Sequence, residues 1–122
     1  MATRKKATSK GRPSASLRTT KAAQRPRVAI LMGSASDGAT MQPASDALLA
    51  LGIASDVRVI SAHRTPERHA RYVRGAEKKG IEVFICGAGF AAHLAGVTAA
   101  LTLLPVLGVP LDSSALNGLD SL

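Results

Sequence analysis

The chain has 122 residues, of which 46% are hydrophobic, so it has the length of one domain and enough apolar content for a core. A single cysteine excludes a disulfide framework and indicates a reducing compartment, and no apolar run approaches the roughly 18 residues of a membrane span. The net charge of +8 is unevenly distributed, because nine of the 16 Lys and Arg residues lie in residues 1–27 and all eight acidic residues follow them.

Residues 1–27 carry a charge of +9 and almost no large apolar side chains, so they cannot bury enough surface to offset the entropy lost on folding. We expect a disordered basic extension at 1–27 and an α/β domain at 28–122. Three interpretations of the extension remain open: a nucleic-acid-binding arm, an organelle transit peptide and a solvated tail. The domain itself has a net charge of −1 and few aromatic residues, so we do not expect it to bind nucleic acid.

From residue 28 onward, short apolar runs alternate with helix-like segments. Residues 28–32 predict a strand that is covered on both faces. The later elements are predicted, in chain order, as a helix from Ser34 to about Leu51, a buried strand at 55–60, a helix at 66–79, a strand at 82–86, a helix at 91–103, a strand at 104–109 and, within 111–122, a loop that leads into another helix. This order predicts a parallel sheet with helices on both faces. In the helix at 66–79 we expect Tyr72, Val73 and Ala76 to face the core and His69 to lie on the surface.

Polar residues follow each predicted strand and should therefore meet at the carboxyl edge of the sheet, where open α/β sheets bind ligands. Ser34, Ser36 and Asp37 follow the first strand. A purely structural interpretation makes them helix caps, for which Ser and Asp are preferred. The functional interpretation assigns Ser34 to a phosphate and Asp37 to a pair of ribose hydroxyls, because a carboxylate accepts hydrogen bonds from a diol.

The segment 61–66, with the sequence SAHRTP, combines a hydroxyl, an imidazole and a guanidinium at a strand-to-helix junction. A helix start offers free N–H groups to an anion, so Ser61 and Arg64 are candidate anion ligands. His63 is the candidate proton carrier, because histidine titrates near neutral pH.

After the strand at 82–86, Gly87, Ala88 and Gly89 predict a turn that lets the backbone approach a ligand closely. His93 follows this turn, and its pattern fits a core or capping histidine as well as a pocket residue.

Together these motifs resemble the class I N5-carboxyaminoimidazole ribonucleotide mutases of purine biosynthesis. The resemblance runs from about Val28 to Leu122 and includes the segments VAILMGSASD, SAHRTP, GAG with AAHL, and LPVLGVP with SALNGLDSL. It implies a flavodoxin-like three-layer α/β/α fold, a cytoplasmic homo-octamer, and an isomerase that moves a carboxylate from N5 to ring carbon C4. It implies no metal and no organic cofactor. The family's last strand and terminal helices would follow Leu122, so the resemblance implies a C-terminally truncated chain.

The resemblance also implies a role for each candidate site residue. Ser34, Ser61 and Arg64 would hold the 5'-phosphate, Asp37 the ribose, and His63 would move the proton. Ser36 would be a further substrate-binding residue, and Gly87, Ala88, Gly89 and His93 would line the pocket for the base and carboxylate. Phe90 stands where the family has another glycine, and Pro43 falls inside the first predicted helix. The alternatives are a carboxylase that uses free carbon dioxide and a non-catalytic nucleotide-phosphate binder.

Overall fold

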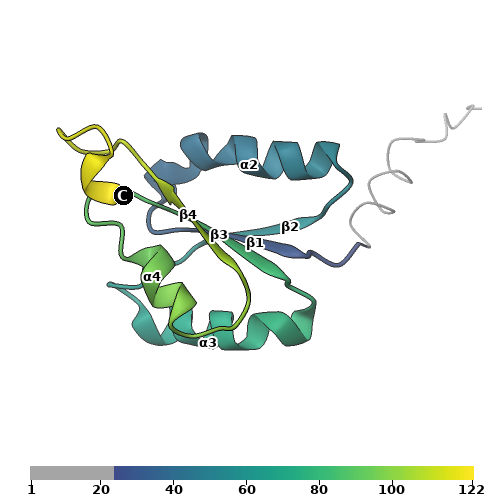
Figure 1. The fold of residues 1–122 in the computed structure, drawn as a ribbon. Coiled ribbons are helices and arrows are strands. Elements are labelled where there is room, and N and C mark those ends of the chain that lie inside the picture. The colour runs from purple at the N-terminus through teal and green to yellow at the C-terminus, as the bar shows by residue number, and fades with distance from the viewer. Residues whose placement is uncertain (1–23) are drawn as a thin grey trace, which may run out of the picture.

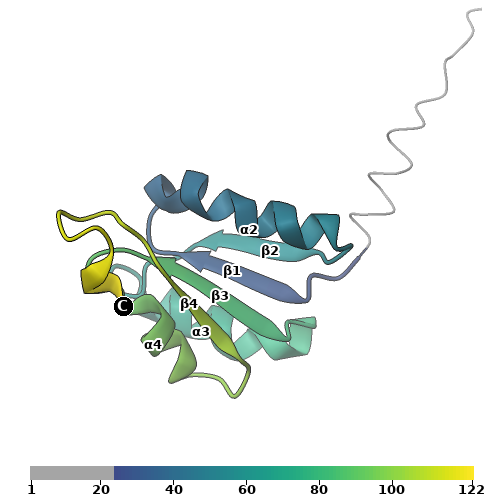
Figure 2. The same cartoon turned by 45° about the horizontal axis from the view of Figure 1, so that its top comes forward.

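The computed structural model describes residues 24–122, and their strands form one parallel sheet in the order β2-β1-β3-β4. The strands are β1 (Val28–Met32), β2 (Ser55–Val59), β3 (Val83–Ala88) and β4 (Val106–Pro110). The helices are α2 (Gly38–Ala50), α3 (Pro66–Ala76) and α4 (Leu94–Ala99), with short 3-10 turns η1 (Ala35–Asp37), η2 (Glu77–Lys79) and η3 (Leu119–Ser121). Helix α2 covers one face of the sheet, and α3 and α4 cover the other (Figure 1, Figure 2). A parallel sheet with helices on both faces is what the sequence pattern predicts, and this order of strands is the flavodoxin-like three-layer arrangement that the family resemblance implies.

The central strand β1 explains why the sheet needs a helix layer on each face. Its five side chains are all buried, and they alternate between two cores. Ala29 and Leu31 join the cluster beneath α3 and α4, whereas Val28, Ile30 and Met32 join the cluster beneath α2. A strand with an apolar residue at every position can bury both sets only between two layers.

Strand β2 differs from the prediction of a buried strand. It lies at an edge of the sheet and pairs only with β1, and Val57 and Val59 are 45% and 42% exposed. Its β-branched residues therefore indicate strand geometry rather than burial.

The segment around α4 also differs from the prediction, because the helix covers only Leu94–Ala99 instead of 91–103. Phe90 and Ala92 adopt positive φ angles of 54° and 45°, which interrupt a helix before Leu94. Beyond the helix, the Thr102 hydroxyl accepts the Leu104 N–H at 3.1 Å, and Pro105 disfavours helical geometry at the residue before it. At the far end, the predicted further helix is a single 3-10 turn at Leu119–Ser121.

Residues 1–23 of the predicted extension at 1–27 lie outside the part of the chain that the structure describes. Arg27 is attached to the domain, because its N–H donates to the Ala54 carbonyl at 3.0 Å and its guanidinium pairs with Glu82 at 2.7 Å. No helix within residues 24–122 is long and apolar enough to cross a membrane.

Candidate active site

A cleft of about 410 Å³ lies at the carboxyl edge of the sheet, where the segments that follow all four strands meet. Eight of the ten predicted site residues line it: Ser34, Ser36, Asp37, Ser61, His63, Ala88, Gly89 and His93. The structure adds several residues to this set, namely Gly33, Ala62, Phe90, Ala91, Ala92, Leu94 and Ser113. Among these additions, Ser113 belongs to the polar residues expected after the fourth strand, and Phe90 stands where the family has another glycine.

Two histidines from different loops meet in the cleft. His63 Nε2 lies 3.0 Å from His93 Nδ1, and the two rings are arranged edge to face. A hydrogen bond between two imidazoles needs one N–H and one bare nitrogen, so this geometry leaves at least one of the facing nitrogens unprotonated. The two facing nitrogens therefore share one hydrogen between them. Pairing with His63 places His93 in the site rather than in the core.

Ser61 and Arg64 shape the junction between β2 and α3. The Arg64 N–H donates to Ser61 Oγ at 3.1 Å, and the Thr65 hydroxyl donates to the Ser61 carbonyl at 3.0 Å. The Arg64 side chain does not line the cleft, and its Nη2 donates to the Gly33 carbonyl at 2.8 Å. Arg64 thus joins the loops after β1 and β2 while keeping guanidinium donors for an anion.

The residues after β1 combine capping with exposure to the cleft. Ser34 is the N-cap of η1, and its Oγ accepts the Ser36 N–H at 3.3 Å and the Ser36 hydroxyl at 2.9 Å. The capping interpretation of Ser34 is therefore confirmed, and both hydroxyls still line the cleft. Asp37 precedes α2 but makes no side-chain capping bond, so its carboxylate remains available to a ligand.

The glycine-containing segment differs from the predicted turn, because Gly87 and Ala88 are the last residues of β3. Gly87 does not line the cleft: a Cβ there would collide with the Met41 side chain, so Gly87 is a packing position. A Cβ at Gly89 would collide with the Ser113 side chain, so only glycine admits Ser113 to the cleft wall. Phe90 follows with 63% exposure, which places its ring at the rim rather than deep in the cleft.

His69 is not a surface residue, contrary to the prediction. It is only 1% exposed, and its Nε2 lies 2.9 Å from Thr98 Oγ1. The spacing of His69, Val73 and Ala76 at i, i+4 and i+7 places all three on the buried face of α3. Arg68 and Arg71 beside it in the sequence obscured this pattern. Burial lowers the pKa of His69, which favours the neutral ring.

Cys86 lies in the same interior, with its Sγ 3.6 Å from Thr98 Oγ1. Burial raises the pKa of this thiol to about 11, so it stays protonated and is not a nucleophile. Across residues 24–122, no three His, Cys, Asp or Glu side chains are grouped in a way that could hold a metal ion.

A family model described as AIR carboxylase matches residues 27–122. The chain belongs to the AIR carboxylase family. The match includes every residue of the cleft and all four strands. The predicted family and the flavodoxin-like fold are thus confirmed.

Individual relatives agree with this membership of the AIR carboxylase family. A Pyrococcus abyssi protein named N5-carboxyaminoimidazole ribonucleotide mutase is 59% identical over 97 residues, which cover 80% of this chain and 56% of that protein. A Brucella melitensis protein of the same name is 58% identical over 95 residues, which cover 78% of this chain and 59% of that protein. The crystal structure of Treponema denticola PurE matches with a TM-score of 0.72 at 30% identity, over 79% of this chain and 61% of that one. The chain therefore spans a little over half the length of these curated relatives.

Proposed function

We propose that the chain carries the catalytic cleft of an N5-carboxyaminoimidazole ribonucleotide mutase, an isomerase of purine biosynthesis. The observation that carries the proposal is the His63–His93 pair, 3.0 Å apart in a cleft that also presents hydroxyl and carboxylate ligands. Relatives that are 58–59% identical bear the name of this activity, which supports the substrate assignment.

The cleft divides into a nucleotide end and a proton-transfer end. At the nucleotide end, Ser34, Ser36 and Ser61 line the cleft and hold the 5'-phosphate, together with Arg64, which lies outside the lining and contributes its free guanidinium N–H groups. The Asp37 carboxylate accepts hydrogen bonds from the ribose hydroxyls. Arg64 is already tied to the Gly33 carbonyl, so little of its side-chain entropy remains to be lost on binding. At the other end, the backbone of Ala88 and Gly89 forms the wall beside the histidine pair.

The reaction needs one proton to be delivered and one to be removed. His63 protonates N5 while the N5–carboxylate bond breaks and carbon dioxide leaves. The nucleophilic ring carbon C4 then attacks carbon dioxide, and His63 takes the proton from the resulting tetrahedral carbon. His93 steadies each protonation state of His63 through their shared hydrogen bond. Holding both fragments in one cleft makes the second bond formation effectively unimolecular.

Replacement of His63 and Arg64 tests these roles. His63→Asn removes the proton carrier, so we expect turnover to fall by about 10²–10⁴-fold while the affinity for aminoimidazole ribonucleotide changes little. Arg64→Ala serves as the matched comparison and should mainly weaken nucleotide binding. Steady-state rates and calorimetric titration measure the two effects. Near-normal turnover by His63→Asn would contradict the proposed proton transfer.

The main alternative is a lyase-type carboxylase that adds free carbon dioxide to aminoimidazole ribonucleotide. The description of the matching family, AIR carboxylase, names this reaction. Turnover with each substrate, with and without bicarbonate, distinguishes the two reactions. Nucleotide binding without any carboxylate migration would instead support a non-catalytic nucleotide-phosphate binder.

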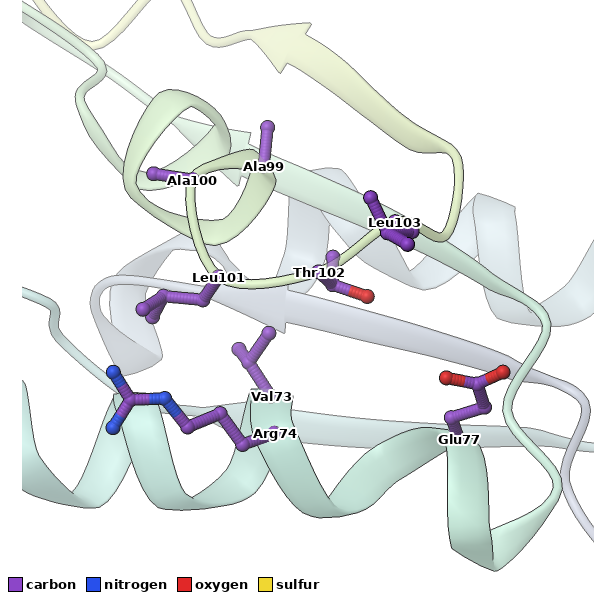
Figure 3. A pocket seen from close by; sticks show the side chains of 8 residues that line it. All are labelled: Val73, Arg74, Glu77, Ala99, Ala100, Leu101, Thr102 and Leu103. Carbon is purple, nitrogen blue, oxygen red and sulfur yellow. The ribbon is translucent and has the colours of Figure 1, made fainter.

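Three wider parts of the proposal concern domain organisation, assembly and location. We propose that residues 28–122 form the mutase-like domain and that residues 1–27 form a basic extension to it, on the basis of their composition. We also propose a cytoplasmic homo-octamer, which the family resemblance supports. A groove between α3 and the loop after α4 adds support, because it is bordered by apolar side chains such as Leu101 and the fully exposed Leu103 (Figure 3). Exposed apolar surface of this kind is typical of subunit contacts.

A further inference from the structure

The positive charge of the domain is confined to one part of the fold. All seven Lys and Arg residues after residue 27 lie within residues 58–79, together with only two of the eight acidic residues, Glu67 and Glu77. This segment includes the end of β2, all of α3 and η2, and β2 is an edge strand of the sheet. The Lys and Arg residues of a domain that is nearly neutral overall are therefore concentrated on the end of β2, the β2–α3 junction, α3 and η2.

A pocket of about 190 Å³ lies within this positive region. It is lined by Arg58, Ile60, Arg68, Arg71, Tyr72 and Lys79, so four of its six residues are cationic. None of these residues lines the candidate active-site cleft. The pocket is thus a separate feature of the molecule.

One carboxylate holds the inner wall of this pocket in place. Asp56 accepts the Arg58 Nε–H at 2.8 Å through one oxygen and the Tyr72 hydroxyl at 2.8 Å through the other. The Arg58 guanidinium carbon lies 5.8 Å from the centroid of the Tyr72 ring, within the range of a cation–π contact. Because only Nε is used in the ion pair, the two terminal nitrogens of Arg58 remain as donors for a ligand.

The other cations of the pocket lack such a partner. Among residues 24–122, Arg68, Arg71 and Lys79 form no ion pair with an acidic side chain. Four like charges that share a small pocket and one carboxylate repel one another, and a multivalent anion relieves that repulsion. Arginine forks also match the geometry of phosphate oxygens.

We propose that this pocket binds an oligophosphate, either free or as the phosphate tail of a nucleotide. A di- or triphosphate matches the four cations in charge and supplies oxygens to several donors at once. A nucleic-acid strand fits less well, because such strands bind through exposed aromatic rings. Tyr72 is the single aromatic side chain of the pocket, and its ring lies against Arg58 with its hydroxyl bound to Asp56.

Calorimetric titration of the whole chain with tripolyphosphate tests the site. We expect saturable binding that includes one ion at this pocket, with an affinity that falls steeply as salt is raised because the charges are exposed to solvent. The double variant R71Q/K79Q should bind about tenfold more weakly or worse, since charge-assisted hydrogen bonds are lost. R74Q is the matched control, because Arg74 lies on the same helix but borders the separate groove beside Val73 and Leu101 (Figure 3). R74Q should bind nearly as the unaltered chain does.

Tyrosine fluorescence gives a second readout that is specific to this pocket. The chain contains one tyrosine and no tryptophan, so its emission reports on Tyr72 alone. Tripolyphosphate should change this emission in the unaltered chain and in R74Q, but much less in R71Q/K79Q.

Further variants and ligands separate this site from other anion-binding features. R64Q, altered at the proposed nucleotide site, should leave tripolyphosphate binding intact, so the outcome does not depend on the proposed enzymatic function. If ATP binds at least as tightly as tripolyphosphate, the ligand of the pocket is the phosphate tail of a nucleotide. If ATP binds more weakly, the ligand is a free oligophosphate. The proposal is overturned if R71Q/K79Q and R74Q bind alike, if R64Q alone abolishes binding, or if single-stranded RNA binds while tripolyphosphate does not.

Discussion

Single residues in or beside the cleft make structural contacts and also present groups that a ligand could reach. Ser34 caps η1 through its Oγ and lines the cleft with the same atom, and Arg64 joins two loops while retaining donors for an anion. The choice between a structural and a functional interpretation is therefore not exclusive at these positions. Substitutions here should affect both folding and binding, which is why the test of proton transfer rests on His63 instead.

His69 makes stability depend on pH, with a direction that follows from its burial. Its pKa is lowered in the folded chain relative to the ordinary value of 6.5, so below that value the unfolded chain binds the proton more readily. The free energy of unfolding should be greatest above about pH 6.5 and should fall as the pH drops toward the lowered pKa of the folded state.

His69→Gln is the control for this prediction, because the amide can still bond to Thr98 but does not titrate. Urea unfolding between pH 5 and 8 measures the slope for both chains. The variant should lose most of the pH dependence in this window. An unchanged slope would assign the effect to other groups.

At the scale of elements, helix α2 contains a proline in its interior, where the helix loses a backbone hydrogen bond. Pro43 lies in the interior of Gly38–Ala50, where it has no N–H to donate to the Ala39 carbonyl one turn earlier. Pro43→Ala should restore that bond and raise the free energy of unfolding by roughly 1–3 kcal/mol. Denaturant unfolding measures the change, and Ala44→Gly in the same helix is a control that should be destabilising. A destabilised Pro43→Ala would show that the neighbouring packing has adapted to the ring.

The order and type of the elements could be predicted from the sequence, because apolar runs such as Val28–Met32 alternate with helical patterns. The exposure of β2 could not, since its position at an edge depends on the order of strands in the sheet. The short α4 likewise follows from positive φ angles at Phe90 and Ala92, residues that rarely adopt them.

The position of the candidate site at the carboxyl ends of the strands could be predicted from the sequence. The shared edge brings Ser34, Ser61 and Gly89 into one cleft, as the order of strands implies. The contact between His63 and His93 depends on two loop conformations that no local pattern specifies. The packing role of Gly87 depends on Met41, which comes from another element.

At the scale of the whole molecule, the apolar surface near Leu103 bears on assembly. Leu103 is fully exposed, so Leu103→Glu should leave the free energy of unfolding within about 0.5 kcal/mol of the unaltered chain. If this surface forms a subunit contact, the charge should weaken association strongly. Sedimentation velocity across a range of concentrations measures the effect. Leu122→Glu, at another exposed leucine, is the control, and equal effects of both variants would contradict a contact centred on the groove.

The central position of β1 has a consequence for how the chain folds as it is made. β1 precedes both of its partners in the sequence, and Val28 pairs with Ser55 in β2 and with Val83 in β3. Among the strands of residues 24–122, β1 is therefore synthesised first, well before β3 can pair with its second edge. Until Val83–Ala88 has been synthesised, one edge of β1 has no strand to pair with, so the sheet can be completed only after that late segment is available.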